Sequence, residues 1–163
     1  MVNGGKEIVP HVVKAVGMTE RPIADGERVI DTDLSRTLVG MMRHVVTTVP
    51  FYRDRTIIPG YDVGGKTGTA QIWDTAMNGG RGGWKHNIFN YSFIGYIGRD
   101  TGVPDLVVAI RIEEGKPTVA KPGQLEMPVM SFQLFRRIAT DAIGTPDLLA
   151  DRPATLAASA ANR

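Results

Sequence analysis

A helical repeat of apolar residues is evident in the first third of the chain. Its spacing of three or four positions places its members on one side of a helix of about four turns. Thr32 or Asp33 suits the N-cap, and Pro50 ends the repeat. We therefore predict a helix over about 33–48, with its apolar stripe in the core, and a connector over 51–60. The stripe consists of Leu34, Leu38, Met41, Val45 and Val49.

A second helical repeat lies near the end of the chain. Pro128 suits the first turn of this helix, and Gly144 with Pro146 forms a stop signal. We predict a helix over about 128–143, followed by an alanine-rich, polar and flexible tail over 149–163. Its apolar face consists of Phe132, Phe135, Ile138, Ala139, Ala142 and Ile143.

Three stretches between these helices have the composition of strands. Aromatic and β-branched residues are concentrated over about 62–73, 91–98 and 106–112. The last is apolar except for Arg111, which is typical of a strand buried on both faces. The glycine-rich segment 74–90 is expected to be a mobile hairpin connection. Helix, three successive strands and helix predict an antiparallel sheet with helices on it, an α+β fold.

The first thirty residues give weaker signals. Residues 7–16 are rich in β-branched residues but contain Pro10, so we expect an extended or edge segment there. A second short strand is possible over 28–30. The turn Asn3-Gly4-Gly5 is typical of a connection that follows an earlier helix or strand, so we expect the chain to be part of a longer protein.

The composition is that of an ordinary globular domain. Of 163 residues, 42% are hydrophobic and 22% charged, which suits one domain with a core. A formal net charge of +2 without a basic run argues against a nucleic-acid partner. The lack of cysteine excludes disulfides and thiolate metal sites. No apolar run reaches the ~18 residues of a membrane span, so any anchor would lie outside this chain.

The most specific local chemistry lies around Lys66, where a lysine and two threonines stand among glycines. One interpretation is a phosphate-binding loop, because Gly60, four further residues and Gly65-Lys66-Thr67 match G-x-x-x-x-G-K-[ST]. That motif needs a strand before it and a helix after it. Here the turn Pro59-Gly60 precedes it and strand-forming residues follow it, which argues against a nucleotide site.

The other interpretation is a substrate-binding strand. Lys66-Thr67-Gly68-Thr69 matches the lysine-threonine-glycine element shared by β-lactamases and penicillin-binding proteins. On a strand, the lysine supplies a fixed positive charge, and a threonine hydroxyl can bind a carboxylate. The glycine lets another backbone approach closely, and the next N–H can point at a developing oxyanion. An ordinary hairpin strand with the same four letters is the alternative, and the rest of the chain decides between them.

Over about residues 1–148 the sequence resembles the C-terminal part of the transpeptidase domain of class B penicillin-binding proteins. Five stretches occur in the order found in the family, and the one around Lys66 is the most specific. The resemblance implies a β-lactamase/transpeptidase-like fold, here with three of the family's five strands. The stretches are Asn3-Gly4-Gly5 with Val9-Pro10-His11, Pro59-Gly60-Tyr61 with Lys66 to Gln71, Ser92-Phe93-Ile94-Gly95-Tyr96, Leu106 to Glu113, and Met127-Pro128-Val129 with Phe132 and Phe135.

The resemblance implies roles for four consecutive residues. Lys66 would be catalytic, helping proton transfer and substrate positioning next to a serine. Thr67 would bind the carboxylate of the acyl-donor peptide or of a β-lactam, and Gly68 would keep the strand flat for close approach. Thr69 would be both catalytic and substrate-binding, giving its backbone N–H to the oxyanion hole. The substrate would lie along this edge as an added strand, and no cofactor or metal is implied.

The family's nucleophile motifs, S-x-x-K and S-x-N, do not occur in these 163 residues. Since acylation needs a serine and its base within hydrogen-bond reach, we expect the chain alone to be inactive. The serines, none of which fits either motif, are Ser35, Ser92, Ser131 and Ser159. The histidines, whose spacing suits neither a metal site nor a triad, are His11, His44 and His86.

The functional prediction is therefore part of a D,D-transpeptidase that cross-links peptidoglycan stem peptides and is inhibited by β-lactams. A non-catalytic, penicillin-binding-like scaffold module and a nucleotide-binding domain are the alternatives. Expected partners are stem peptides, β-lactams, the N-terminal half of the same domain, and divisome or elongation proteins. The parent protein is expected at the outer face of the bacterial cytoplasmic membrane. Because the missing strands would pair beyond 106–112, we expect an isolated chain to expose this edge and self-associate.

Overall fold

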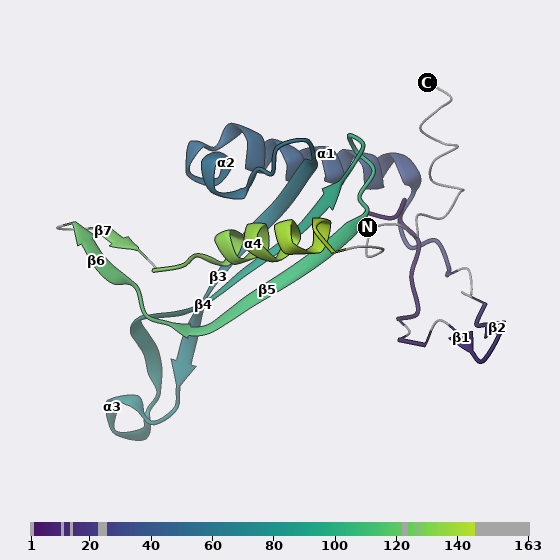
Figure 1. The fold of residues 1–163 in the computed structure, drawn as a ribbon. Coiled ribbons are helices and arrows are strands. Elements are labelled where there is room, and N and C mark those ends of the chain that lie inside the picture. Colours follow the sequence, from purple (N-terminus) through teal and green to yellow (C-terminus); the bar gives the residue numbers. More distant parts are fainter. Residues whose placement is uncertain are drawn as a thin grey trace.

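The computed structural model of the chain describes residues 2–10, 12–13, 15–22, 26–121, 124–126 and 128–145. Its main body is an antiparallel sheet in the order β3-β4-β5 with helices packed on it, as Figure 1 shows. The strands are β3 (Asp62–Asp74), β4 (Gly83–Gly98) and β5 (Leu106–Gly115). The α+β prediction with three hairpin-connected strands is confirmed. The predicted tail over 149–163 lies outside the described residues.

Helix α1 (Thr32–Thr48) forms where it was predicted but buries a different side. Its N-cap is Asp31, whose carboxylate accepts a hydrogen bond from the Leu34 N–H at 2.8 Å. The buried residues are Ser35, Val39 and Val46, whereas the predicted stripe is partly exposed, with Met41 60% exposed. The helix carries apolar residues on two neighbouring sides, and β3 covers the one that contains Val39 and Val46.

The predicted connector over 51–60 contains a further helix, α2 (Pro50–Thr56). Pro50 does not only end the previous helix; it occupies the first turn of α2, where its fixed φ and missing N–H are favourable. The rings of Phe51 and Tyr52 make edge-on contacts with Phe132, which joins α2 to the last helix. The prediction of a connector here was wrong because proline suits both a helix end and a helix start.

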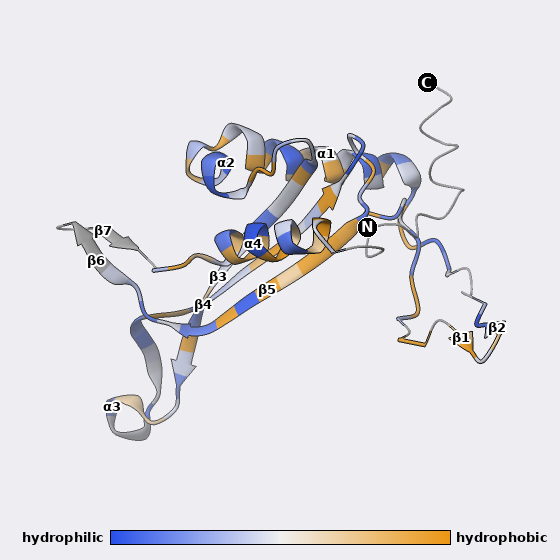
Figure 2. Ribbon diagram, viewed as in Figure 1, coloured by the Kyte–Doolittle hydropathy of each residue, from blue (hydrophilic) through white to orange (hydrophobic). Residues whose placement is uncertain are grey.

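The last helix, α4 (Ser131–Ile143), begins three residues later than predicted. Pro128 lies before it, and the Gln133 side chain accepts a hydrogen bond from the Met130 N–H at the N-terminus. Its apolar side lies on the sheet and is orange in Figure 2. The core joins α1, the residues after α2, the sheet and α4 through Val46, Ile58, Val63, Phe93, Ile97, Phe132, Phe135 and Ala139.

The segment 74–90 joins two strands of a hairpin, as expected, but most of it is regular structure and not a loop. It contains the short helix α3 (Met77–Gly80) and the first half of β4, and Trp73 and Trp84 pair edge-on across the hairpin at 5.1 Å. Between the pairs Gln71–Phe89 and Trp73–Trp84, β3 has one residue and β4 has four, residues 85–88. This bulge turns the end of the hairpin away from the sheet (Figure 1).

Strand β5 was predicted to be buried on both faces, and the structure contradicts this. Its side chains alternate, with Leu106, Val108 and Ile110 partly buried against the core and Val107 48% exposed. Helix α4 covers one face of β4 and β5, and the exposed side chains of β5 lie on the other face. The strand is an edge of the sheet, as predicted.

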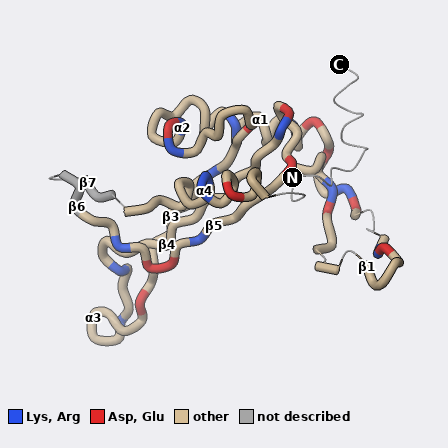
Figure 3. Tube along the Cα trace, viewed as in Figure 1, with Lys and Arg blue, Asp and Glu red and all other residues tan. Residues whose placement is uncertain are grey.

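The remaining elements are small. The described residues within 7–16 form no long strand; a two-residue pair joins β1 (Ala15–Val16) to β2 (Thr19–Glu20), and the backbone of Arg28 forms an isolated bridge with Lys6. A second pair joins β6 (Thr118–Lys121) to β7 (Gln124–Glu126). Charges of both signs are interspersed along the described chain (Figure 3). None of the described helices has the length and hydropathy needed to span a membrane.

Candidate functional site

Lys66, Thr67, Gly68 and Thr69 lie in the middle of β3, which has β4 on one side and no described strand on the other. The strand runs without interruption through Lys66, and no helix begins at Thr67. The structure therefore agrees with the sequence argument against a phosphate-binding loop. The β-branched threonines favour the strand and pair with aromatic residues of β4, Thr67 with Phe93 and Thr69 with Tyr91.

The two glycines before Lys66 are needed for packing. A Cβ atom on Gly64 would lie 2.4 Å from the Tyr96 ring and 2.8 Å from the backbone nitrogen of Arg43 in α1. A Cβ atom on Gly65 would lie 2.3 Å from the Phe93 ring. The glycine run that resembled a phosphate cradle thus lets β3 approach α1 and its neighbouring strand closely.

The start of β3 is fixed by a buried carboxylate. Asp62 accepts hydrogen bonds from the Tyr96 hydroxyl at 3.3 Å and from the Gly102 N–H at 2.7 Å, and Arg43 lies 3.8 Å away. Burial and then the negative charge of Asp62 raise the pKa of Tyr96 well above its ordinary value, so the hydroxyl stays protonated and donates. The cluster ties β3 to α1 and to the β4–β5 turn.

Thr67 and Lys66 point to opposite faces of the sheet, because side chains alternate along a strand. Thr67 shares a face with Phe93, which packs on α4, and its hydroxyl oxygen lies 3.2 Å from the Tyr52 hydroxyl of α2. Lys66 is exposed, and its ammonium donates to the Thr67 carbonyl at 2.8 Å. No carboxylate pairs with Lys66 in the described part of the chain.

The backbone of this segment offers an outward-facing edge. The Lys66 ammonium reaches the Thr67 carbonyl, which indicates that this group points away from β4. In an antiparallel strand every second residue points its N–H and C=O the same way, so the Thr69 N–H shares this direction. A Cβ atom on Gly68 would lie 2.6 Å from the Ser92 hydroxyl oxygen, so a side chain here would displace the Ser92 side chain. A cation, a hydroxyl, a glycine and an outward-facing N–H thus come from four consecutive residues, Lys66 to Thr69.

The described residues hold no serine activated by a base next to Lys66. Ser35 and Ser131 are buried, and Ser92 lies on β4 opposite Gly68. His44 and His86 are exposed, and His11 lies outside the described residues. A cation, a hydroxyl and an N–H in this arrangement can bind and polarise an acyl group, and the described residues place no nucleophile beside them.

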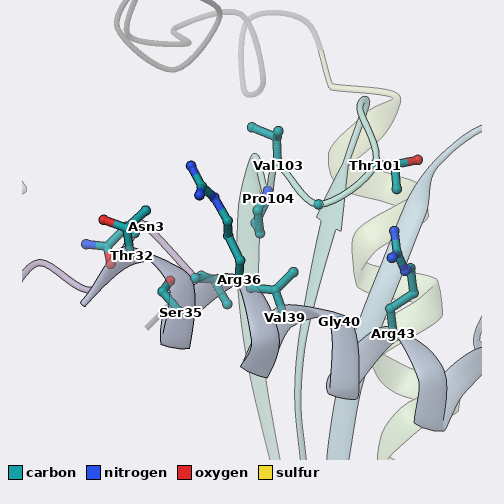
Figure 4. A pocket seen from close by; sticks show the side chains of 13 residues that line it. Asn3, Thr32, Ser35, Arg36, Val39, Gly40, Arg43, Thr101, Val103 and Pro104 are labelled. Carbon is teal, nitrogen blue, oxygen red and sulfur yellow. The ribbon is translucent and has the colours of Figure 1, made fainter. Parts of the chain in front are cut away.

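A cavity of about 400 Å³ lies elsewhere, between the first residues, α1 and the β4–β5 turn (Figure 4). Its charged lining consists of Arg36 and Arg43, and both have acidic partners: Asp33 at 2.9 Å from Arg36, and Asp62 near Arg43. None of the residues predicted to bind substrate lines it. Because its cations are neutralised within the fold, we assign the site to the β3 edge and not to this cavity.

Sequence patterns had not indicated Tyr52, Asp62 or Tyr96. Tyr52 lies in a segment predicted to be a connector, and its contact with Thr67 bridges 15 positions. The contact between Asp62 and Tyr96 bridges 34 positions. No short-range signal identifies either contact; the only signal was the resemblance of the stretches around Tyr61 and Tyr96 to a known family.

Comparison with known proteins gives a consistent result. A family model described as the penicillin binding protein transpeptidase domain matches residues 1–131. The chain is 30% identical over 150 residues to penicillin-binding protein PbpB of Mycobacterium tuberculosis, an alignment that covers 85% of this chain and 20% of the relative. The chain thus spans about a fifth of that relative's length.

Two solved structures illustrate the similarity of the fold. Penicillin binding protein 3 from Mycobacterium tuberculosis, complexed with aztreonam, has a TM-score of 0.63 and 26% identity, over 88% of this chain and 32% of that chain. The D,D-transpeptidase domain of a peptidoglycan glycosyltransferase from Eggerthella lenta has a TM-score of 0.64 and 22% identity, over 90% of this chain and 30% of that chain.

Proposed function

Because the chain belongs to the penicillin-binding protein transpeptidase family, whose model matches residues 1–131, we propose that it forms the C-terminal part of a D,D-transpeptidase domain. The proposed reaction cross-links peptidoglycan stem peptides through a serine acyl-enzyme. The serine and its lysine base come from the N-terminal half of the same domain. The observation that carries the proposal is the lysine-threonine-glycine segment on an open strand edge.

The residues of this edge account for the binding half of the reaction. The acyl-donor peptide pairs with β3 as an added strand, which Gly68 permits because it has no side chain. Thr67 donates a hydrogen bond to the substrate carboxylate, and the Thr69 N–H binds the oxyanion that develops on the scissile carbonyl. Lys66 supplies a positive charge beside the serine and helps its proton move.

The chemistry has two steps. The serine oxygen bonds to the scissile carbonyl carbon, the C–N bond breaks, and the serine proton leaves with the amine. The amine of a second stem peptide then attacks the ester carbonyl, the bond to the serine oxygen breaks, and the amine's proton returns to that oxygen, which leaves a free serine and the cross-link. A β-lactam reacts in the first step only, which is consistent with the aztreonam complex of the similar penicillin binding protein 3.

The location and partners of the whole protein belong to the same proposal. It acts at the outer face of the cytoplasmic membrane, where its substrates are, and is anchored by a segment outside these residues. Its partners are stem peptides, β-lactams, and divisome or elongation proteins, and not nucleic acid.

The test uses the longer gene product that contains this chain. Fluorescent penicillin should label the wild type, and Lys66→Ala should abolish labelling, because the variant removes the cation beside the serine. Lys116→Ala, an exposed lysine just after β5, is the matched control and should label normally. Residues 1–163 alone should stay unlabelled.

Two outcomes would contradict the proposal. A wild type that folds but is never labelled would favour a non-catalytic scaffold module. Labelling of residues 1–163 alone would show that no other segment supplies the nucleophile.

A further inference from the structure

The contact between Tyr52 and Thr67 joins α2 to the candidate site. It is the one side-chain hydrogen bond that links a described helix to the Lys66–Thr69 segment, with 3.2 Å between the hydroxyl oxygens. The Tyr52 ring is held edge-on by Phe132 at 5.3 Å and by Phe51 at 5.5 Å. The Tyr52 hydroxyl therefore approaches Thr67 from a ring with little freedom to move.

The single hydrogen on each hydroxyl determines the direction of the hydrogen bond between Tyr52 and Thr67. A carboxylate has no hydrogen to donate, so a Thr67 hydroxyl that binds one must give it its single hydrogen. The hydroxyl oxygen then has lone pairs left, and Tyr52 can only donate to them. If Thr67 instead donated to Tyr52, it would turn lone pairs toward the carboxylate, which is repulsive.

With a carboxylate bound to Thr67, the two hydroxyls would therefore form a directed chain from Tyr52 to Thr67 to the carboxylate. Each bond in such a chain polarises the next and strengthens it. A neutral group in place of the carboxylate gains far less, because hydrogen bonds to charged acceptors are stronger than those to neutral ones.

We propose that Tyr52 is a positioning residue that keeps Thr67 a hydrogen-bond donor, and so gives the site its preference for a substrate with a free carboxylate. The inference rests on the proposed function, in which Thr67 binds that carboxylate. Tyr52 does not touch the substrate; it acts through Thr67.

The experiment compares two ligands on the longer gene product: a penicillin, and the methyl ester of the same penicillin, which lacks the charge. The second-order acylation rate constant is measured for each ligand by mass spectrometry.

Tyr52→Phe keeps the ring contacts with Phe132 and removes only the hydroxyl. It should lower the rate for the free acid about tenfold and leave the rate for the ester within twofold. Tyr61→Phe, which removes a hydroxyl from a residue packed against the core, should change neither rate.

A double-mutant cycle with Thr67→Val tests the route. Thr67→Val should lower the rate for the free acid at least as much as Tyr52→Phe, and the double variant should lose no more than Thr67→Val alone. Additive losses would overturn the inference, since Tyr52 would then act independently of Thr67. Equal losses for acid and ester would also overturn it, because they would indicate a structural role only.

The outcomes separate this inference from the proposed function. A wild type without any acylation would end both. A wild type that is acylated, with a Tyr52→Phe variant that keeps the wild-type ratio of acid to ester rates, would end this inference and leave the proposed function in place.

Discussion

The hydroxyl of Tyr96 lies 3.3 Å from the carboxylate of Asp62 and 3.4 Å from the carbonyl of Val39, so one side chain of β4 connects the first residue of β3 to α1. This connection lies four residues before Lys66 on the same strand. The position of the candidate site relative to α1 therefore depends on a contact that has no part in its chemistry.

Tyr96→Phe should destabilise the chain by about 1–2 kcal/mol at neutral pH, because a buried carboxylate loses a donor while the ring stays in place. Urea denaturation measures the loss.

The pH dependence of the stability gives a second check. The pKa of Tyr96 is raised in the folded state, so its contribution is complete below the ordinary tyrosine pKa of about 10 and is lost as the pH rises toward the folded value. The wild type should therefore lose more stability than Tyr96→Phe above about pH 10. Parallel pH profiles for the two proteins would contradict this.

Gly64→Ala should cost about 1–3 kcal/mol, because the new methyl group would lie against the Arg43 backbone nitrogen, which cannot move without shifting α1. Gly40→Ala is the matched control. It lies inside α1 with nothing within 4 Å of the added atom, so it should gain about 0.5–1 kcal/mol from helix propensity. Thermal unfolding measures both, and an unchanged Tm for Gly64→Ala would argue against the close approach of α1 to β3.

The ion pair between Lys85 and Glu114 joins β4 to β5 near the hairpin bulge. The hydrogen bond that Lys85 donates, and then its charge, lower the pKa of Glu114, and the same bond to the Glu114 carboxylate raises the pKa of Lys85. The pair therefore stabilises the fold above the ordinary glutamate pKa of about 4.3, and this is lost as the pH falls through the lowered value. On the alkaline side the contribution of Lys85 is complete below about 10.4 and is lost as the pH rises through its raised value.

An NMR titration of the Glu114 carboxylate checks this prediction. Lys85→Met should return the pKa of Glu114 toward its ordinary value. Lys116→Met should move it less, because Lys116 acts only through its charge. A Glu114 titration that Lys85→Met leaves unchanged would show that the pair does not form in solution.

The isolated chain should self-associate through the open edge of β5. Val107 is 48% exposed and Ile94 is 52% exposed on the face of the sheet opposite α4, and Val107 lies on β5, which has no described partner strand on its other side. Light scattering should give a mass that rises with concentration, and Val107→Lys should reduce it. Val29→Lys, at a residue that is 70% exposed and lies away from the sheet, is the control. A monodisperse monomer at all concentrations would contradict the prediction.

Much of the fold could be predicted because its elements carry periodic patterns. Helices α1 and α4 and the three strands follow from spacing and turn residues, and the placement of Lys66 on an edge strand follows from its motif and the strand-forming residues after it. The buried side of α1 did not follow, because Met41 and Val46 belong to two equally apolar stripes and only the position of β3 chooses between them.

The part of the site that the sequence did not reveal depends on contacts between distant positions. Pro50 suits a helix end as well as a helix start, so α2 was missed, and with it the hydroxyl of Tyr52 beside Thr67. The roles of Lys66, Thr67, Gly68 and Thr69 stay predictions until the substitutions above are made.

The bulge at residues 85–88 has a consequence for how this family can diversify. The hydrogen-bond pairing between β3 and β4 is already interrupted at this bulge, so an insertion or deletion in the outer part of the hairpin need not change the pairing before it. The pairing from Asp62 to Gln71 then keeps its register, and Lys66 and Thr69 keep their places. Homologous chains should therefore differ most in length between Ile72 and Ile88 while the segment before it stays constant, which makes the outer hairpin the region where lineages can acquire new surface without altering the reactive edge.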